Sequence, residues 1–282
     1  MLKPALLLML VACAASAQAP PLAMKSTEVF GQKIRYHESG TGDRTVIFLH
    51  GLGGYADMWA ANAPAFAAKY HVFAPDQIGF GTSDKPFLNY RVQTMVDFLD
   101  GFYRAVNIQR ATLIGNSLGG WIAAAFTLAH PEKVERLVLV DSAGVGASNT
   151  DRNVLLGLNP SSVAGMKAVL KLIFYNKAMI TDAFAEQAFA GHMRNNDGYT
   201  INAFIDSIQR KEDFVEERLG SIRTLTLVVW GAQDELTPIA MGNTMHQGIS
   251  GSEMVTLDKC GHVPQAECSA RFNEAVLQWL AK

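Results

Sequence analysis

The sequence predicts an α/β protein with a mostly parallel central sheet, helices on both faces and an inserted helical segment. Short runs rich in Val, Ile and Leu alternate with stretches of helical periodicity, which is typical of parallel sheets. Several of these runs are apolar at every position, as strands are when helices cover both faces of a sheet. One long segment, 145–213, contains no convincing strand.

The expected elements follow one another along most of the chain. Strands are predicted at 33–37, 45–49, 72–74, 111–114, 137–140, 225–230 and 254–257. Helices are predicted at 92–105, at 118–129 before a proline, and at 270–280. This order favours one large domain, which a chain of 282 residues is long enough to build.

Segment 145–213 is predicted to be a helical cap inserted into a core made of 24–144 and 214–282. Val163, Met166, Leu170, Ile173 and Phe174 recur at helical spacing on one face of this segment. Packing inside the cap accounts for most of its Met and Phe side chains. A minority of them could face a pocket.

The first 17 residues are predicted to be a signal peptide. Residues 1–3 make a short basic start, residues 5–15 are apolar, and Ala15-Ser16-Ala17 offers the small residues that a signal peptidase reads before Gln18. The alternative is a lipoprotein signal that makes Cys13 the lipidated first residue. Either reading predicts export, to the periplasm or beyond. No later apolar run is long enough to span a membrane.

Composition narrows the set of partners. The chain is 49% hydrophobic and 18% charged, with 24 Lys and Arg against 26 Asp and Glu. Without a basic stripe or a recognisable motif, nucleic acid is not expected as a partner. The mature chain would keep Cys260 and Cys268, which form either a disulfide or two buried thiols. The oligomeric state is left open.

Ser117 is the candidate nucleophile. It lies between Gly115 and Gly119 in the pattern G-x-S-x-G, directly after an expected strand and directly before an expected helix. Such a turn presents the serine hydroxyl above the edge of the sheet, where the helix amino terminus favours negative charge. The pattern alone is weak evidence, so an acid and a histidine have to follow the serine in the sequence, in that order.

Asp234 and His262 complete a predicted catalytic triad. Each follows an expected strand, and the order serine, acid, histidine is the one that this turn requires. Asp141 is a rival acid, because it also ends an expected strand. Asp234 is preferred, because its loop fits the order while Asp141 leads into the insertion.

The glycine-rich stretch His50-Gly51-Leu52-Gly53-Gly54 is predicted to supply half of an oxyanion hole. One N–H donor would come from Leu118 and the other from Leu52, with His50 orienting the loop. The residues assigned to substrate contact are Asn116, Gly51 and Gly53. No metal ligand set and no cofactor motif is expected, and 76–81 is interpreted as a structural turn.

These motifs together resemble the α/β-hydrolase fold, and in particular its serine hydrolases. The resemblance covers nearly all of 26–282 and implies a serine nucleophile without a cofactor. Among the branches, small carboxylesterases and the carbon-carbon hydrolases of ring-fission products are similar to this chain. The second branch commonly has a tryptophan directly after the catalytic histidine, where this chain has Val263.

The expected function is therefore hydrolysis of a neutral carboxylic ester through an acyl-enzyme. Export would also separate the chain from cytoplasmic ring-fission products. The cap supplies apolar side chains for a pocket wall and shows no cluster of Arg or Lys to receive an anion. The apolar candidates are Met166, Leu170, Phe174, Phe184, Phe189 and Phe204. Two alternatives stay open: a carbon-carbon bond hydrolase, and a non-catalytic binding protein that retains the fold.

Overall fold

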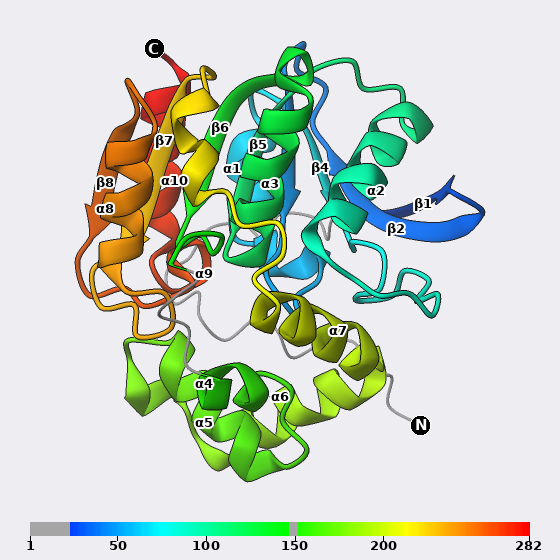
Figure 1. The fold of residues 1–282 in the computed structure, drawn as a ribbon, viewed down its shortest axis with the longest axis vertical. Helices are drawn as coiled ribbons and strands as arrows, with labels where there is room; N and C mark the ends of the chain where they lie inside the picture. Colours follow the sequence, from blue (N-terminus) through cyan, green and yellow to red (C-terminus); the bar gives the residue numbers. More distant parts are fainter. Residues whose placement is uncertain (1–22, 147–151) are drawn as a thin grey trace.

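The computed structural model describes residues 23–146 and 152–282. Its centre is an eight-stranded sheet in the order β1-β2-β4-β3-β5-β6-β7-β8 (Figure 1). Strands β3 to β8 run parallel, while β1 and β2 run antiparallel to their neighbours. The expected fold class is confirmed. The strands are β1 (Ala23–Val29), β2 (Gln32–Ser39), β3 (Thr45–Leu49), β4 (His71–Pro75), β5 (Ala111–Asn116), β6 (Val134–Val140), β7 (Thr226–Gly231) and β8 (Glu253–Leu257).

Helices cover both faces of the sheet, as the apolar runs predict. Ile47 of β3 belongs to the core under one set of helices, and its neighbour Phe48 belongs to the core under the other set. Side chains alternate across a strand, so a strand that is apolar at each position builds two cores at once. One face carries α2 (Val92–Ala105), α3 (Leu118–Ala129) and α8 (Ile239–Gly248), and the other carries α1 (Ala63–Ala67) and α10 (Ser269–Leu280).

Four elements are absent from the sequence prediction: β1, α1, α8 and the short helix α9 (Pro264–Glu267). Strand β1 has no alternating apolar pattern, because most of its described side chains are exposed. It is held by pairing with β2 through a tight turn, in which Phe30 and Gly31 both have positive φ. Helices α2 and α3 have the predicted bounds, since both have strong apolar faces and clear ends.

The segment between β6 and β7 forms helices and no strand within its described residues. It contains α4 (Arg152–Gly157), α5 (Val163–Ile173), α6 (Asp182–Asn195) and α7 (Gly198–Gln209). These helices lie beyond the carboxyl ends of the parallel strands (Figure 1). We call α4 to α7 the cap.

The cap has a small core of its own and also packs on the sheet domain. Four of the six apolar candidates, Met166, Leu170, Phe174 and Phe184, contact one another or their neighbours in this core. Phe204 of α7 instead stacks on Phe80, with ring centroids 6.0 Å apart. The cap is therefore attached to the core mainly through α7.

The predicted signal peptide, including Cys13 and Gln18, lies outside the described residues. None of the helices in 23–146 and 152–282 is long and apolar enough to cross a membrane.

Candidate active site

Ser117 lies on a sharp turn between β5 and α3. Its backbone has φ 56° and ψ −120°, a conformation that costs a non-glycine residue about 1–3 kcal/mol. The turn needs glycine on both sides. A Cβ added at Gly115 would lie 2.2 Å from the carbonyl oxygen of Gly119, and one added at Gly119 would lie 2.2 Å from that of Leu49. The strained turn leaves Ser117 partly exposed at the amino terminus of α3.

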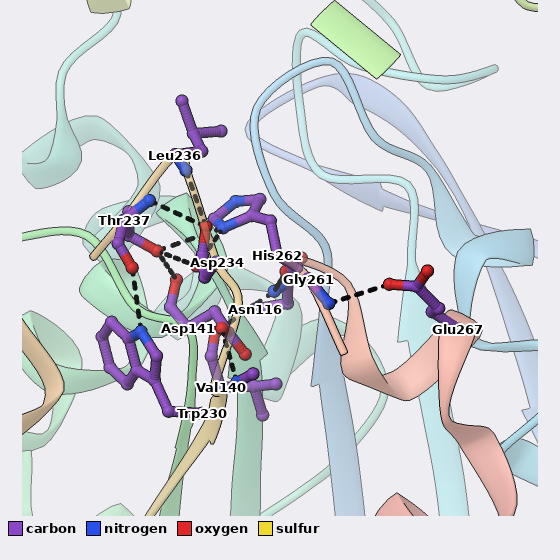
Figure 2. Close-up of polar contacts among 11 residues, drawn as sticks. Asn116, Val140, Asp141, Trp230, Asp234, Leu236, Thr237, Gly261, His262 and Glu267 are labelled. Atoms are coloured by element: carbon purple, nitrogen blue, oxygen red, sulfur yellow. Dashed lines mark hydrogen bonds and ion pairs between the residues drawn. The ribbon is translucent and has the colours of Figure 1, made fainter. Parts of the chain in front are cut away.

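His262 and Asp234 are paired at the carboxyl ends of β8 and β7 (Figure 2). Nδ1 of His262 lies 2.8 Å from Oδ2 of Asp234, and the two side chains are 4% and 0% exposed. The other oxygen of Asp234 accepts hydrogen bonds from the N–H groups of Leu236 and Thr237. Because Nδ1 donates to the carboxylate, Nε2 is the basic nitrogen of the neutral imidazole.

Opposing effects act on the Asp234 carboxyl. Burial raises its pKa, but the charge of His262 and the hydrogen bonds from His262, Asp141 and Thr237 outweigh burial and hold the pKa below its ordinary value. Asp234 is therefore an anion at neutral pH, which is the state that can stabilise an imidazolium.

Asn116 connects the serine turn to the histidine loop. Its side-chain amide donates hydrogen bonds to the backbone carbonyls of His262 (3.0 Å) and Val140 (3.2 Å) (Figure 2). The side chain is buried, and both amide hydrogens are used inside the protein. Asn116 thus brings Ser117 and His262 to the same corner of the sheet, while its contact with substrate stays a prediction.

The loop 50–54 places backbone N–H groups beside Ser117. A Cβ added at Gly51 would lie 3.1 Å from Cβ of Ser117. The carbonyl of Gly51 accepts from the N–H of Gly54 (3.0 Å) and from His50 Nδ1 (2.8 Å). In a trans peptide the N–H of Leu52 then points the opposite way. Within the described part of the chain, the N–H groups of Leu52 and Leu118 have no protein acceptor, so both can serve an oxyanion.

His50 acts in this loop as a neutral ring. Its Nε2 accepts a hydrogen bond from the N–H of Gln77 (3.1 Å), so Nδ1 carries the proton that is donated to Gly51. Burial lowers the pKa of His50, although the Gly51 carbonyl and the charge of Asp76 act in the opposite direction. Gly53, the other glycine assigned to substrate contact, has φ +67° and faces Ile201 of the cap.

Asp141, the rival acid, lies beside Asp234 rather than beside the imidazole nitrogen. It is 0% exposed, and its Oδ1 accepts a hydrogen bond of 2.9 Å from the N–H of Gly231. The structure thus gives the hydrogen bond with His262 Nδ1 to Asp234. Burial and the neighbouring negative charge of Asp234 raise the pKa of Asp141 well above its ordinary value.

Asp141, Asp234 and His262 also form the one group in the described chain whose ligand atoms lie close enough to hold a metal ion, within 4.8 Å of one another. The oxygens of Asp234 already accept hydrogen bonds from two backbone N–H groups, the Thr237 hydroxyl and His262. A cation would have to replace this network. The donor set therefore fits a hydrogen-bonded triad better than a metal site.

The disulfide between Cys260 and Cys268 closes the loop that carries His262. The sequence left a disulfide and two thiols as alternatives, and the structure has the disulfide. Sulfur atoms of both residues also lie near the guanidinium of Arg271, at 3.2 and 3.1 Å. The loop that carries His262 is thereby tethered to the start of α10.

Glu267 ties the same loop to the cap, a role that the sequence did not reveal. Its carboxylate accepts hydrogen bonds from the N–H groups of Gly261 (2.8 Å), Tyr175 (3.0 Å) and Asn176 (2.7 Å). Figure 2 shows the first of these bonds. A glutamate in a short helix is ordinary in sequence. Two of its three donors come from the segment after α5 and one from the loop that carries His262, and only the folded chain brings these segments together.

The sheet order, the strained serine, the histidine-aspartate pair and the two free N–H groups are the architecture of an α/β hydrolase. A family model described as the alpha/beta hydrolase fold matches residues 44–267. The chain belongs to this family, and it is a hydrolase.

Named relatives match nearly the whole chain. A 2-hydroxymuconate semialdehyde hydrolase of Pseudomonas sp. (strain CF600) is 33% identical over 89% of this chain and 92% of its own length. A 2-hydroxy-6-oxononadienedioate/2-hydroxy-6-oxononatrienedioate hydrolase of Paraburkholderia xenovorans (strain LB400) is 31% identical over 88% of this chain and 91% of its own. The solved structure of a meta-cleavage product hydrolase from Pseudomonas fluorescens IP01 superposes with TM-score 0.84 at 28% identity, covering 92% and 98% of the two chains.

These relatives correct the expected activity. They are named for ring-cleavage products, so the prediction of a hydrolase of neutral carboxylic esters is wrong and its carbon-carbon alternative is favoured. The reason is chemical. The motifs around Ser117, Asp234 and His262 predict a nucleophile and a base for attack on a carbonyl carbon. They do not indicate whether the leaving group is attached through oxygen or through carbon. The alternative of a non-catalytic protein has no support among these relatives.

Proposed function

We propose that this protein hydrolyses a carbon-carbon bond beside a carbonyl group in a conjugated 2-hydroxy-6-oxo acid or semialdehyde. The observation that carries the proposal is the 33% identity, over 89% of the chain, with a relative named for 2-hydroxymuconate semialdehyde. The geometry at Ser117, His262 and Asp234 supports it, because cleavage next to a carbonyl needs a nucleophile, a proton carrier and oxyanion donors.

The reaction adds the elements of water across the broken bond. Ser117 Oγ attacks the carbonyl carbon as His262 Nε2 takes its proton, and the oxyanion is held by the N–H groups of Leu52 and Leu118. The bond to the neighbouring carbon breaks. Because the 2-hydroxyl group has first ketonised, which moves its proton onto that carbon, the fragment leaves as a conjugated enolate. His262 then returns its proton to the enolate oxygen. Water then hydrolyses the acyl-enzyme, which releases a carboxylic acid and restores Ser117.

A carbon leaving group makes a particular demand on His262. An alkoxide accepts its proton in any geometry that reaches the oxygen, whereas a conjugated enol has to be protonated at one particular carbon before the bond beside it can break. His262 is suited to such positioning because its backbone is held by Asn116 and Ile173 and its ring by Asp234. The hydrogen bond from His262 N to the carbonyl of Ile173 measures 2.7 Å and ties the general base to the cap.

The test compares two leaving groups on one enzyme. Purified protein would be assayed with 2-hydroxymuconate semialdehyde, followed by loss of its visible absorption, and with p-nitrophenyl butyrate. We expect kcat/KM of at least about 10⁴ M⁻¹ s⁻¹ for the first substrate, within the ordinary range of enzymes on their own substrates. The ester value should be roughly 100-fold lower. Hydrolysis of the ester without turnover of the semialdehyde would overturn the proposal.

Ser117→Ala tests whether both activities belong to this site. It should lower kcat by roughly 10³-fold or more on either substrate, because the triad members act as a unit. Ser26→Ala is the matched control, since Ser26 is exposed on β1 far along the sheet from Ser117. It should leave both rates unchanged.

Export of the chain is a separate proposal, and it rests on the leader pattern of residues 1–17. The disulfide between Cys260 and Cys268 supports it, since such bonds persist in oxidising compartments. Intact mass of protein from the native host should show a chain that begins at Gln18. A chain that begins at a lipidated Cys13 would support the lipoprotein alternative, and an uncleaved chain would contradict export by either route.

A further inference from the structure

Asp141 is a buried carboxyl group with half of its hydrogen-bonding capacity unused. It has positive φ (41°) at the end of β6, and its side chain is 0% exposed. Oδ1 accepts from the N–H of Gly231, while no donor in the described chain reaches the fully buried Oδ2. A charged carboxylate would leave this oxygen desolvated and unpaired, which is costly.

The neighbours of Asp141 make a negative charge there still less favourable. The ionisable side chains that face it are Asp234, from the loop after β7, and His262, from the loop after β8. Within the described chain, the ion pair that involves these two carboxyls joins Asp234 to His262, and neither carboxyl pairs with a lysine or an arginine. Two carboxylates in contact cannot both ionise without a compensating cation.

We propose that Asp141 is a positioning residue that holds its proton at neutral pH and donates it in a hydrogen bond to the Asp234 carboxylate. The assignment follows from geometry: Oδ2 of the buried Asp141 has no donor in the described chain, and the carboxyl groups of Asp141 and Asp234 each have an oxygen within 4.8 Å of one another. It rests on the proposed roles of Asp234 and His262 in the reaction.

This hydrogen bond has a consequence for His262. Asp234 is then the single anion of the cluster, with Asp141, Thr237 and two backbone N–H groups fixing the orientation of its carboxylate. A donated proton also withdraws charge from Asp234, which moderates how strongly Asp234 stabilises the imidazolium. Loss of the donor should therefore move the acid limb of the pH-rate profile to higher pH.

The upward shift in the pKa of Asp141, caused first by burial and then by Asp234, agrees with this assignment. A raised pKa makes the folded state less stable as pH rises. The native state keeps a proton that the unfolded chain releases above about pH 4. The stabilising contribution is therefore complete below that pH and is lost as pH rises toward the raised pKa.

The first test does not depend on the reaction. The infrared spectrum of the wild type minus that of Asp141→Asn, at about pH 8, should contain the carbonyl band of a protonated carboxylic acid. Asn keeps the acceptor for Gly231 and a neutral donor for Asp234, so this variant should fold. Its Tm should rise relative to the wild type by roughly 3 °C for each pH unit between about pH 5 and 8. Asp43→Asn, an exposed residue before β3, is the control and should show neither effect.

The second test reads the effect on catalysis. Asp141→Asn should retain kcat within about threefold, since it keeps the donor, whereas Asp234→Asn should lose roughly 10²-fold or more. Asp141→Leu removes the donor at similar volume. It should lower kcat roughly 10-fold and move the acid limb upward by about half a pH unit, which a merely structural loss would not do.

The outcomes separate this inference from the proposed function. No acid band and no change of Tm slope would overturn the inference, whatever substrate the enzyme uses. If Asp141→Asn loses as much activity as Asp234→Asn, Asp141 is needed as a charged acid and the inference is wrong. If the semialdehyde is not cleaved, the pH-rate measurements can be made on whichever substrate is turned over, and the infrared result is unaffected.

Discussion

The side-chain amide of Asn116 donates a hydrogen bond of 3.0 Å to the backbone carbonyl of His262, across 146 positions of sequence. This contact connects the strand that ends at the nucleophile with the loop that carries the general base. The same amide binds the carbonyl of Val140, the last residue of β6. Three strand ends are thus held in register by one buried side chain.

Asn116→Ala should therefore lower both activity and stability. The His262 carbonyl would lose this donor, while the Val140 carbonyl would keep the N–H of Ser117, so the free energy of unfolding should fall by about 1–2 kcal/mol. His262 would no longer be fixed relative to Ser117, and kcat should fall roughly 10- to 100-fold. Chemical denaturation and steady-state kinetics measure the two effects.

Thr112→Val is the control for Asn116→Ala, because Thr112 lies on the same strand with a buried hydroxyl that has no partner in the described chain. Its removal should change stability by less than about 1 kcal/mol and leave kcat unchanged. An Asn116→Ala enzyme with wild-type kcat would show that the hydrogen bond from Asn116 to the His262 carbonyl does not position His262.

Gly51→Ala should damage catalysis without unfolding the chain. The new methyl group would lie 3.1 Å from Cβ of Ser117, close enough to displace the serine or the Leu52 N–H. We expect kcat to fall roughly 10- to 100-fold, comparable to the loss of one oxyanion donor. Gly157→Ala, whose added Cβ meets nothing within 4 Å, should match the wild type. Equal activity of the two variants would contradict the assignment of the loop 50–54 to the active site.

The disulfide should support both the fold and the general base. It closes a loop with a sequence separation of 8, for which chain entropy predicts about 2–3 kcal/mol of stability. A double variant, Cys260→Ser with Cys268→Ser, should lose that amount, and its kcat should fall at temperatures where it is still folded. Reductant should affect the wild type in the same way and leave the double variant unchanged. Two free thiols in protein never exposed to reductant would contradict the bond.

Arg91 and Asp213 should give a stability contribution that disappears in acid. The Arg91 guanidinium binds both carboxylate oxygens, at 2.8 and 2.5 Å, and joins the start of α2 to the end of the cap segment. Burial raises the pKa of Asp213, but the hydrogen bonds from Arg91 and Gln93 and the charge of Arg91 outweigh it and lower the pKa below 3.8.

A lowered pKa means that this stability is complete above the ordinary pKa of the carboxyl and is lost as pH falls through the lowered value. Arg91→Gln should therefore reduce the free energy of unfolding by about 1 kcal/mol at neutral pH and by progressively less as pH falls below about 3.8. Arg104→Gln, which breaks an exposed pair on the same helix, should cost less than about 0.5 kcal/mol. A cost for Arg91→Gln that is constant with pH would mean that packing, and not the ion pair, holds α2 to the cap.

The sequence by itself determined the elements that depend on local pattern. The apolar runs predicted seven of the eight strands, because burial on both faces leaves a continuous apolar signature. The missed strand, β1, is exposed and is defined by its pairing with β2, which no local pattern records. The serine turn and its glycines were also predictable, since the close approach of Gly115 and Gly119 backbones is a constraint within five residues.

Tertiary structure alone decided how the strand ends meet and what each carboxyl does there. Both Asp141 and Asp234 follow strands, and the sequence preferred Asp234 only from the order of the motifs and the place of the insertion. The difference arises because β6, β7 and β8 lie side by side, so that Asp234 faces His262 while Asp141 is enclosed against Asp234. The same holds for Asn116, Glu267 and the free N–H of Leu52, whose partners are fixed by strand order and by the approach of the cap. Residue type and spacing predict a nucleophile and its base, but hydrogen bonds across distant segments depend on register and burial, which exist only in the folded chain.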